Sequence, residues 1–427
     1  MAKEELIVVR GGKPITGTVH ICGAKNSALK LMAASVMANG KVKLNNVPRI
    51  SDVSIMSEVL SVLGARVENG AAHGQDEHTL FIDTSEVVSF ETPYELVAKM
   101  RASISILGPL IARFGKARVA MPGGCQIGAR KLDMHITSLE AIGVEFKTDH
   151  GFIDASAPNG LHGAEIVLDF PSVGATENLM MASCSAQGVT TIRNAACEPE
   201  IEDLASFLND MGANVEGAGT PTVVITGVDS MHGAEHTTVG DRIEAGTFLT
   251  AGALIGGPVT VEGVDPNHLA LALKKLAEMG CEVSTAPNSV TVSRKGPLLP
   301  TDIQTLPHPG FPTDLQAQFM VLSALANGSS IITENVFENR FMFASELQRM
   351  GADIRIDGHH ALINGVSSFS GAPVSSTDLR GGAALVIAGL AAEGETIVHD
   401  IHHIDRGYED YVGKLAGLGA NVERVSL

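Results

Sequence analysis

The sequence predicts an α/β protein of two domains, each an inside-out α/β barrel in which sheets surround buried helices. Three observations support this fold class. The chain has 427 residues, more than one ordinary hydrophobic core can use. Apolar residues make up 44% of the chain and charged residues 18%, which is typical of a compact protein with a large core. A pattern of helix, glycine and strand recurs six times along the sequence.

The recurring pattern contains two series of glycines. In the first series an apolar residue, a glycine and a small residue lead into a strand; its glycines are Gly64, Gly143, Gly212, Gly280, Gly351 and Gly419. In the second series an apolar helix ends at a glycine and a strand follows; its glycines are Gly40, Gly115, Gly188, Gly257, Gly328 and Gly394. Each glycine of the second series stands about where the left-handed residue after a helix is expected. We therefore expect six units of roughly seventy residues, three in each domain.

The helices that precede the second series are too apolar to lie on a surface. Residues 381–392, for example, contain no charged or polar side chain. A helix that is apolar all round is a buried helix. We therefore expect these helices inside each domain, with three sheets packed around them.

Charge and cysteine usage exclude several classes of function. The formal net charge is −18, so most of the surface would repel nucleic acid and anionic membranes. The five cysteines have neither metal-ligand spacing nor the even number of a disulfide framework. The N-terminus lacks the apolar run of a secretory signal, and glycines and a proline interrupt the uncharged run at 245–261. These features predict a soluble cytoplasmic protein; the sequence carries no signal for an oligomeric state.

Metal and nucleotide motifs find little support. Alternation in "TIVHDIHHID" predicts a strand with His399 and His403 on one face and His402 on the other, which does not favour a metal site. The sequence has no Walker loop and no dinucleotide-binding glycine motif. No metal or organic cofactor is predicted.

The stretch from Met121 to His135, "MPGGCQIGARKLDMH", has the composition of a functional loop. Cys125 lies among three glycines, and Arg130 and Lys131 follow it. Glycine lets the backbone approach a ligand or move as a lid, and a thiol near cations can act as a nucleophile or a proton donor. The alternative is a glycine-rich turn around a buried, inert cysteine.

Charged residues recur where the helices of the second series begin. The residues at or near these equivalent positions are Lys25, Arg101, Glu177, Arg242, Asp314 and Arg380. The helix macrodipole disfavours cations at such ends, so Lys25, Arg101 and Arg380 suggest a bound anion. Salt bridges to neighbouring acids are the alternative. Because Arg340 and Arg406 lie in the turns that follow strands, we expect a cleft for a highly anionic substrate lined by these cations and Arg130.

Ten motifs, in order along nearly the whole chain, resemble the UDP-N-acetylglucosamine 1-carboxyvinyltransferase family, the enolpyruvyl transferases of peptidoglycan synthesis. The motifs are CGAKNSAL, MRASI, PGGCQIGAR, SVGATEN, EPEIED, DRIEAGTF, FPTDLQAQ, VFENRF, TDLR and IDRGYED. The resemblance implies two domains, each of three βαβαββ units. It places residues 1–22 and 240–427 in one domain and residues 23–239, with the Cys125 loop, in the other.

The resemblance also implies the reaction and its residues. The enolpyruvyl group of phosphoenolpyruvate would move to the 3-hydroxyl of UDP-N-acetylglucosamine, with release of phosphate and without a cofactor. Cys125 resembles the family's proton donor, which fosfomycin alkylates, and Asp314 the carboxylate beside the attacking hydroxyl. Lys25 and Arg406 complete the implied catalytic set. The implied substrate contacts are Lys25, Asn26, Arg101, Arg130, Lys131, Leu132, Asp133, Met134, Ser172, Val173, Gly174, Asp314, Val336, Arg340, Asp378, Arg380 and Arg406.

Two other functions compete with this interpretation. A 5-enolpyruvylshikimate-3-phosphate synthase-like transferase would share the fold and phosphoenolpyruvate, but the cysteine loop and "SVGATEN" argue against it. A catalytically weak paralogue that binds UDP-sugars and regulates the pathway would not need Cys125, Asp314, Lys25 and Arg406, which are all present.

The sequence departs from the family pattern at two places. Phe170 and Pro171 precede "SVGAT", where some members carry a lysine that reaches the diphosphate, and Lys131 stands where proline is common. We hypothesise that Lys131 replaces the missing charge. Lys131→Ala should then raise the Michaelis constant for the UDP-sugar in steady-state kinetics, and an unchanged constant would count against this hypothesis.

Overall fold

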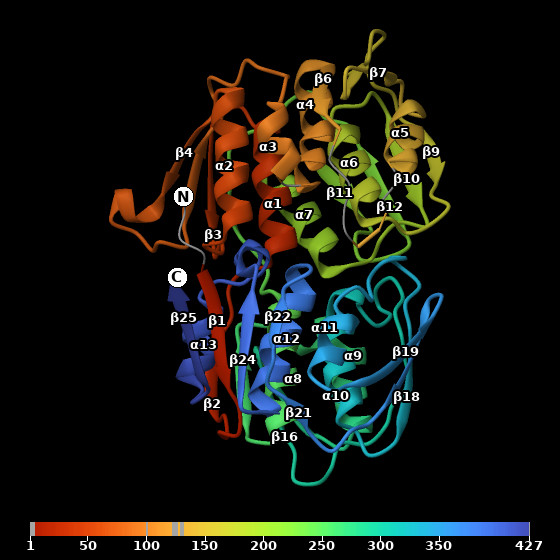
Figure 1. Ribbon diagram of the computed structural model, residues 1–427. Coiled ribbons are helices and arrows are strands. Elements are labelled where there is room, and N and C mark those ends of the chain that lie inside the picture. The colour runs from red at the N-terminus through yellow and green to blue at the C-terminus, as the bar shows by residue number, and fades with distance from the viewer. Residues whose placement is uncertain (1–4, 100, 122–126, 129–131, 427) are drawn as a thin grey trace. The chain divides into compact units, whose positions relative to one another are not determined.

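The computed structural model describes residues 5–99, 101–121, 127–128 and 132–426, with the backbone alone for 97–99, 101–103 and 149. The chain divides into two compact units, and Figure 1 labels many of their elements. Unit 1 comprises Met1–Cys22, Gln126–Ala129 and Gly240–Leu427, and unit 2 comprises Gly23–Cys125 and Arg130–Val239. Apart from Gln126–Ala129, the chain thus passes from unit 1 to unit 2 after Cys22 and returns at Gly240.

Unit 2 contains three successive repeats of helix and strand. The first is α1 (Lys25–Ala34), η1 (Ser35–Met37), β3 (Lys41–Asn45), α2 (Ser51–Leu63), β4 (Arg66–Asn69), η2 (Gly70–His73) and β5 (Leu80–Asp83). The second is α3 (Tyr94–Lys99), η3 (Arg101–Ile106), α4 (Leu107–Phe114), β6 (Lys116–Ala120), α5 (Asp133–Glu140), β7 (Glu145–Asp149), β8 (Phe152–Ser156) and β9 (Glu165–Val167). The third is α6 (Val173–Ser183), β10 (Val189–Arg193), α7 (Pro199–Asp210), β11 (Asn214–Glu216), β12 (Thr222–Thr226) and β13 (Glu235–Thr237).

Three sheets form from the described strands of unit 2, in the orders β13-β3-β5-β4, β6-β8-β7 and β11-β12-β10-β9. The last strand, β13, pairs in parallel with β3 of the first repeat, with His236 in register with Leu44. The sheets therefore link the third repeat to the first and, through β9, the second to the third. A parallel bridge between Glu91 and Arg118 joins the segment after β5 to β6 of the second repeat. Helices α4 and α6 pack against each other inside, and residues 175–183 of α6 are all buried.

Unit 1 repeats the same order of elements. Its first repeat is α8 (Arg242–Ile255), β14 (Val259–Glu262), η4 (Pro266–Leu269), α9 (Ala270–Glu278), β15 (Glu282–Ala286), β16 (Ser289–Ser293) and β17 (Ile303–Gln304). Its second is η5 (Thr313–Leu315), α10 (Gln316–Ala324), β18 (Ser329–Thr333), α11 (Ala344–Arg349), β19 (Asp353–Asp357), β20 (His360–Asn364), β21 (Phe369–Ser370) and β22 (Pro373–Ser375). Its third is α12 (Leu379–Ala391), β23 (Ala392–Glu393), β24 (Glu395–His399), η6 (Ile401–Arg406), α13 (Tyr411–Gly417) and β25 (Asn421–Ser426).

The N-terminal strands complete unit 1. Strand β1 (Glu5–Arg10) lies between β24 and β25, and β2 (Gly17–His20) pairs in parallel with β14. The larger sheets have the orders β22-β24-β1-β25, β15-β16-β14-β2 and β17-β18-β20-β19, and β21 pairs with β23. Helices α8, α10 and α12 pack against one another, and every residue of α10 is buried. The expected fold class, with six repeats and buried helices, is confirmed.

Two local predictions were wrong. Within the second series of glycines, Gly115 ends its helix in the left-handed conformation, but the left-handed residue after α8 is Gly256 (φ +90°) instead of Gly257, whose backbone approaches the carbonyl oxygen of Ile15. The other four glycines of the series lie two or more residues beyond the C-cap residues of their helices. The strand expected through His403 ends at His399, and η6 follows. In the second case Asp400 adopts φ +56°, which ends the alternation of side chains between two faces.

Among the described residues, no helix combines the length and the apolar character that crossing a bilayer requires.

Gly351 tests the role of the glycines of the first series. It has φ +96°, and no atom lies within 4 Å of the position that a Cβ would take. Gly351→Ala should therefore lower the unfolding free energy by about 1–2 kcal/mol through backbone strain alone. Gly417 in α13 is the matched control, because its surroundings are also open and its φ is not positive. Thermal unfolding should show a lower midpoint for Gly351→Ala and an equal or higher one for Gly417→Ala; a shift of equal size in both would contradict this account.

Candidate active site

In unit 1 the carboxylate of Asp314 is shared by two buried arginines. Arg340 Nη2 donates to Asp314 Oδ1 over 2.8 Å, and Arg380 Nη2 donates to Asp314 Oδ2 over 3.1 Å. Arg340 and Arg380 are each 3% exposed, and the Asp314 side chain is 23% exposed. The cluster therefore carries an excess of positive charge, with Asp314 as its most accessible member.

Three elements of unit 1 hold this cluster. Asp314 lies in η5, directly before the buried helix α10. Arg380 lies in the first turn of α12, where the Asp378 carboxylate caps the backbone N–H groups of Arg380 and Gly381 at 2.9 and 3.1 Å. Arg340 follows the turn after β18. Three of the predicted substrate contacts, Asp314, Arg340 and Arg380, are thus in direct contact, and Asp378 orients the helix that carries one of them.

The guanidinium of Arg380 is held in its charged state. Burial lowers the pKa of Arg380. The nearby Tyr408, Asp314 and Asp241 raise this pKa by a larger amount, so the pKa of Arg380 is raised overall. The group lies 5.3 Å from the centroid of the Tyr408 ring, at cation–π distance. Among the described residues, Nη1 of Arg380 is buried without a hydrogen-bond partner. An N–H group of a buried cation that lacks a partner can donate a hydrogen bond to an anionic oxygen of a ligand.

Glu334, which the sequence analysis missed, organises the backbone around the cluster. Its Oε1 accepts hydrogen bonds from the N–H groups of Val336 and Phe337, at 2.8 and 3.1 Å, and from Thr305 Oγ1 at 2.9 Å. Its Oε2 accepts from the hydroxyl of Thr313, the residue before Asp314, over 2.8 Å. Glu334 is 3% exposed. One buried carboxylate thus connects the segment of Asp314 with the turn that carries Val336 and leads to Arg340.

The described part of the cysteine loop, Ile127 and Gly128, belongs to unit 1 and lies against the same turn. The N–H of Asn339 donates to the carbonyl of Ile127 over 3.1 Å, and a Cβ at Gly128 would come within 2.6 Å of Glu338 Oε2. Cys125, Arg130 and Lys131 lie outside the described residues.

Arg406 lies at the end of η6, half-buried. Burial lowers the pKa of His403, and the charges of His402 and Arg406 lower it further, while Asp378 and Asp400 act in the opposite direction. The charges of Arg406 and Asp378 therefore both act on the pKa of His403, in opposite directions. A neutral His403 adds no charge to this part of unit 1.

In unit 2, Lys25 is the first residue of α1. Its Nζ lies 2.8 Å from Asp52 Oδ2 in the first turn of α2. Lys25 is 8% exposed and Asp52 is fully buried. The salt-bridge alternative considered from the sequence therefore applies to Lys25, and to Arg380 through Asp314. Asn26 is exposed next to Lys25, whereas the side chain of Arg101 lies outside the described residues.

The predicted UDP-sugar contacts of unit 2 lie at the beginnings of two packed helices. Leu132, Asp133 and Met134 begin α5, and Ser172, Val173 and Gly174 begin α6, where Ser172 Oγ accepts from the N–H of Ala175. A Cβ at Gly174 would meet the ring of His135 at 2.9 Å, so the glycine permits this close packing. Asn178 supports the arrangement through His135 Nδ1 and the N–H of Gly108. The two predicted segments are therefore neighbours.

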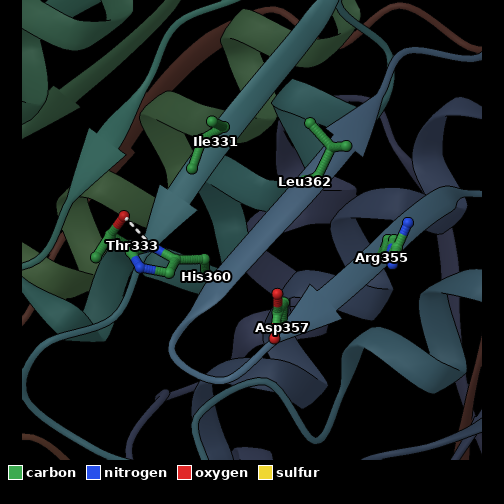
Figure 2. A pocket seen from close by; sticks show the side chains of 6 residues that line it. All are labelled: Ile331, Thr333, Arg355, Asp357, His360 and Leu362. Atoms are coloured by element: carbon green, nitrogen blue, oxygen red, sulfur yellow. Dashed lines mark hydrogen bonds between the residues drawn. The ribbon is translucent and has the colours of Figure 1, made fainter.

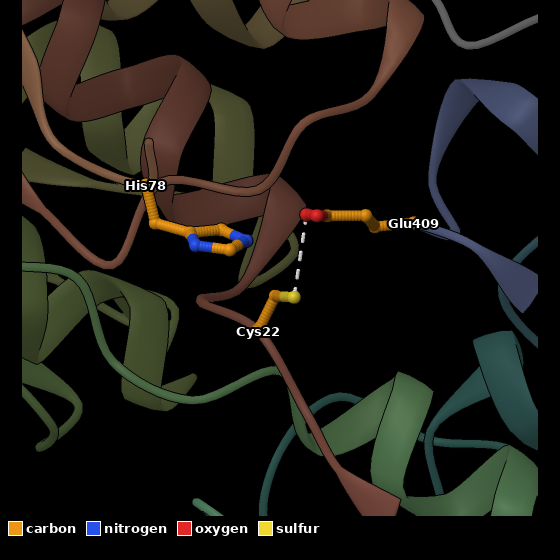
Figure 3. Close-up of side chains that lie close together, drawn as sticks. All are labelled: Cys22, His78 and Glu409. Atoms are coloured by element: carbon orange, nitrogen blue, oxygen red, sulfur yellow. Dashed lines mark hydrogen bonds between the residues drawn. The ribbon is translucent and has the colours of Figure 1, made fainter. Parts of the chain in front are cut away.

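The four described cysteines offer no activated thiol. Burial raises the pKa of Cys22 and of Cys184 to about 12 and that of Cys281 to about 11, and it also raises the pKa of Cys197. Figure 3 shows the Cys22 thiol, which donates to Glu409 Oε2 over 3.3 Å. Because a thiolate is the reactive form, these cysteines are structural, which leaves Cys125 as the candidate.

A pocket of about 500 Å³ opens on the outer face of β18, β19 and β20. Figure 2 shows its lining side chains, among them Thr333 and His360, which share a 2.9 Å hydrogen bond. The lining contains none of the predicted site residues. We therefore do not assign the reaction to this pocket.

Comparison with known proteins identifies the class of protein first. Residues 9–415 match the model of the family described as EPSP synthase (3-phosphoshikimate 1-carboxyvinyltransferase). The enolpyruvyl transferase NikO from Streptomyces tendae superposes with a TM-score of 0.89, at 29% identity, over the whole of both chains. An EPSP synthase from Acinetobacter baumannii, at 17% identity and a TM-score of 0.75, covers 99% of this chain and 100% of that one and shares the fold. The protein is a carboxyvinyltransferase.

More similar relatives narrow the family. UDP-N-acetylglucosamine 1-carboxyvinyltransferase 2 of Carboxydothermus hydrogenoformans is 53% identical over 424 residues, 99% of this chain and 100% of that protein. UDP-N-acetylglucosamine 1-carboxyvinyltransferase 1 of Staphylococcus aureus is 50% identical over 421 residues, 98% of this chain and 99% of that protein. The chain therefore belongs to the UDP-N-acetylglucosamine 1-carboxyvinyltransferase family, which confirms the family predicted from the sequence.

Substitution of Glu334 tests its role in the cluster. Glu334→Ala leaves four donors without this acceptor and should lower the unfolding free energy by on the order of 3 kcal/mol. Glu334→Gln keeps an oxygen at the position of Oε1 and should retain most of the stability. Denaturant unfolding checks both variants, and equal losses for alanine and glutamine would refute the hydrogen-bonding role.

Proposed function

We propose that the protein transfers the enolpyruvyl group of phosphoenolpyruvate to the 3-hydroxyl of UDP-N-acetylglucosamine and releases phosphate. The observation that carries the proposal is the full-length similarity, at 50–53% identity, to proteins named for this carboxyvinyl transfer. The buried cations around Asp314 and the pair of Lys25 with Asp52 support it, because both substrates are anionic. We further propose that units 1 and 2 are the two catalytic domains, and that the reaction serves peptidoglycan synthesis in the cytoplasm.

The proposed chemistry needs an acid and a base at opposite ends of the reacting pair. Cys125 would deliver a proton to the methylene carbon, because a thiol with a pKa of roughly 8.5 is mostly protonated at neutral pH. Asp314 would accept the proton of the sugar hydroxyl as its oxygen attacks the enol ether carbon. Expulsion of phosphate with loss of a methyl proton then restores the double bond.

The remaining residues would bind and orient the two substrates. Lys25, Arg130 and Arg406 are assigned to the phosphate and carboxylate of phosphoenolpyruvate, with Arg101, Arg340 and Arg380 as neighbouring cations. The buried donor at Nη1 of Arg380, which has no hydrogen-bond partner among the described residues, suits such an anion. The UDP-sugar is assigned to Asn26, Lys131, the segments 132–134 and 172–174, Asp314 and Val336, with Asp378 as the cap that orients Arg380.

Phosphate release from phosphoenolpyruvate, with and without UDP-N-acetylglucosamine, tests this function. Release should require the UDP-sugar and stop after treatment with fosfomycin. Cys125→Ser should lower kcat by about 10²-fold or more, as loss of a general acid does. Cys197→Ser is the matched control, since its thiol donates, among the described residues, to the Ala195 carbonyl. Release with shikimate 3-phosphate instead, or none with either acceptor, would overturn the proposal.

A further inference from the structure

His236, on β13 of unit 2, lies between two carboxylates of α7. Its Nε2 is 2.9 Å from Asp203 Oδ1, and its Nδ1 is 2.8 Å from Asp210 Oδ2. The side chains of His236 and Asp203 are 9% and 8% exposed, whereas Asp210 is 45% exposed. The imidazole ring also packs against Phe207, with 5.4 Å between ring centroids.

This geometry requires a charged imidazole. An ionised carboxylate only accepts hydrogen bonds, and both ring nitrogens are donors only in the imidazolium form. Burial lowers the pKa of His236, but its hydrogen bonds to Asp203 and Asp210 and their charges outweigh burial, so the pKa is raised. On the neighbouring strand β3, Lys43 pairs with Glu235 instead of approaching the ring, so Asp203 and Asp210 are the charges that face it.

The second oxygen of Asp203 holds two segments that are distant in sequence. Oδ2 accepts a hydrogen bond from the hydroxyl of Ser27 in the first turn of α1, and another from the N–H of Val239 over 3.2 Å. The carbonyl of Val239 in turn accepts from the N–H of Ala24 over 2.6 Å. Ala24 is the N-cap of α1, and no side chain among the described residues caps it. In place of a side-chain cap, the carboxylate of Asp203 therefore anchors the first turn of α1, directly through Ser27 and indirectly through Val239 and Ala24.

The turn anchored in this way carries Lys25 and Asn26, two of the proposed substrate contacts. We propose that His236 is a positioning residue, which as an imidazolium fixes Asp203 and thereby Ser27, so that Lys25 is held ready for the anionic substrate. The inference rests on the proposed function for its kinetic consequence, and on the structure of unit 2 alone for the anchoring.

The sign of the pH dependence follows from the raised pKa. The stabilisation from His236 is complete below its unfolded pKa, about 6.5, and is lost as the pH rises through the higher pKa of the folded protein. In the wild type, the Michaelis constant for phosphoenolpyruvate should therefore rise as His236 loses its proton. A purely structural role would change stability without this rise, which forms the high-pH limb of the plot of the Michaelis constant against pH.

The test measures kcat and both Michaelis constants across this pH range for the wild type, His236→Gln and Asp210→Asn. His236→Gln should raise the Michaelis constant for phosphoenolpyruvate about 10-fold at low pH, the scale of one charge-assisted hydrogen bond, and should lack the limb. Asp210→Asn keeps the bond to Asp203 but removes a charge, so it should move the limb to lower pH. His73→Gln is the matched control, because His73 on η2 pairs with Glu68 on β4 over 2.8 Å.

A wild-type limb that persists unmoved in His236→Gln, or an equal loss in His73→Gln, would overturn the positioning role. Amide hydrogen exchange of residues 25–31 keeps the inference separate from the proposed function. If the wild type releases no phosphate, the proposed function fails and exchange alone decides. Faster exchange in His236→Gln than in the wild type below pH 6.5 then supports the anchor, and equal protection refutes it.

Discussion

The need to balance charges inside apolar units governs this structure. The inner helices are almost wholly apolar, yet several of them begin with an ionised side chain that the fold buries. Three such charges have an opposite charge in their own unit: Arg380 meets Asp314, Lys25 meets Asp52, and Glu177 meets Lys30. Arg340, in the turn after β18, shares Asp314 with Arg380. A buried charge without a partner costs several kcal/mol, so these pairs decide which helix ends can face one another. A carboxyvinyltransferase can use the same charges, because its substrates are anions that compete for the arginines.

The cluster in unit 1 shows how structural and functional roles combine. Asp314 neutralises part of the charge of two arginines, and it is also the most exposed member of the cluster. Glu334 and Asp378 accept hydrogen bonds from backbone and hydroxyl groups on both sides of these charges and so fix the segments that carry them. Charges held in this way need little rearrangement when a substrate arrives, which is the condition for electrostatic catalysis.

Much of the fold was predictable from the sequence, because it is repeated six times and its glycines have a local cause. All six glycines of the first series have positive φ, as expected for residues that end helices. The displacement from Gly257 to Gly256 arose because two adjacent glycines satisfy the same pattern. Motifs identified Asp314, Arg340 and Arg380, which lie together. Asp52, Asp203, His236 and Glu334 were missed, because each acts through a partner distant in sequence that only the folded chain brings near.

The most direct measurement of the central claim is a double-mutant cycle on kcat/KM with Arg340→Gln, Asp314→Asn and the double variant. If Asp314 and Arg340 act as one charged unit, the losses will be non-additive, and the second substitution will cost less once the first is present, by a coupling of roughly 0.5–3 kcal/mol. Losses that simply add would show that the two residues act independently, and would contradict the account of a shared electrostatic cluster.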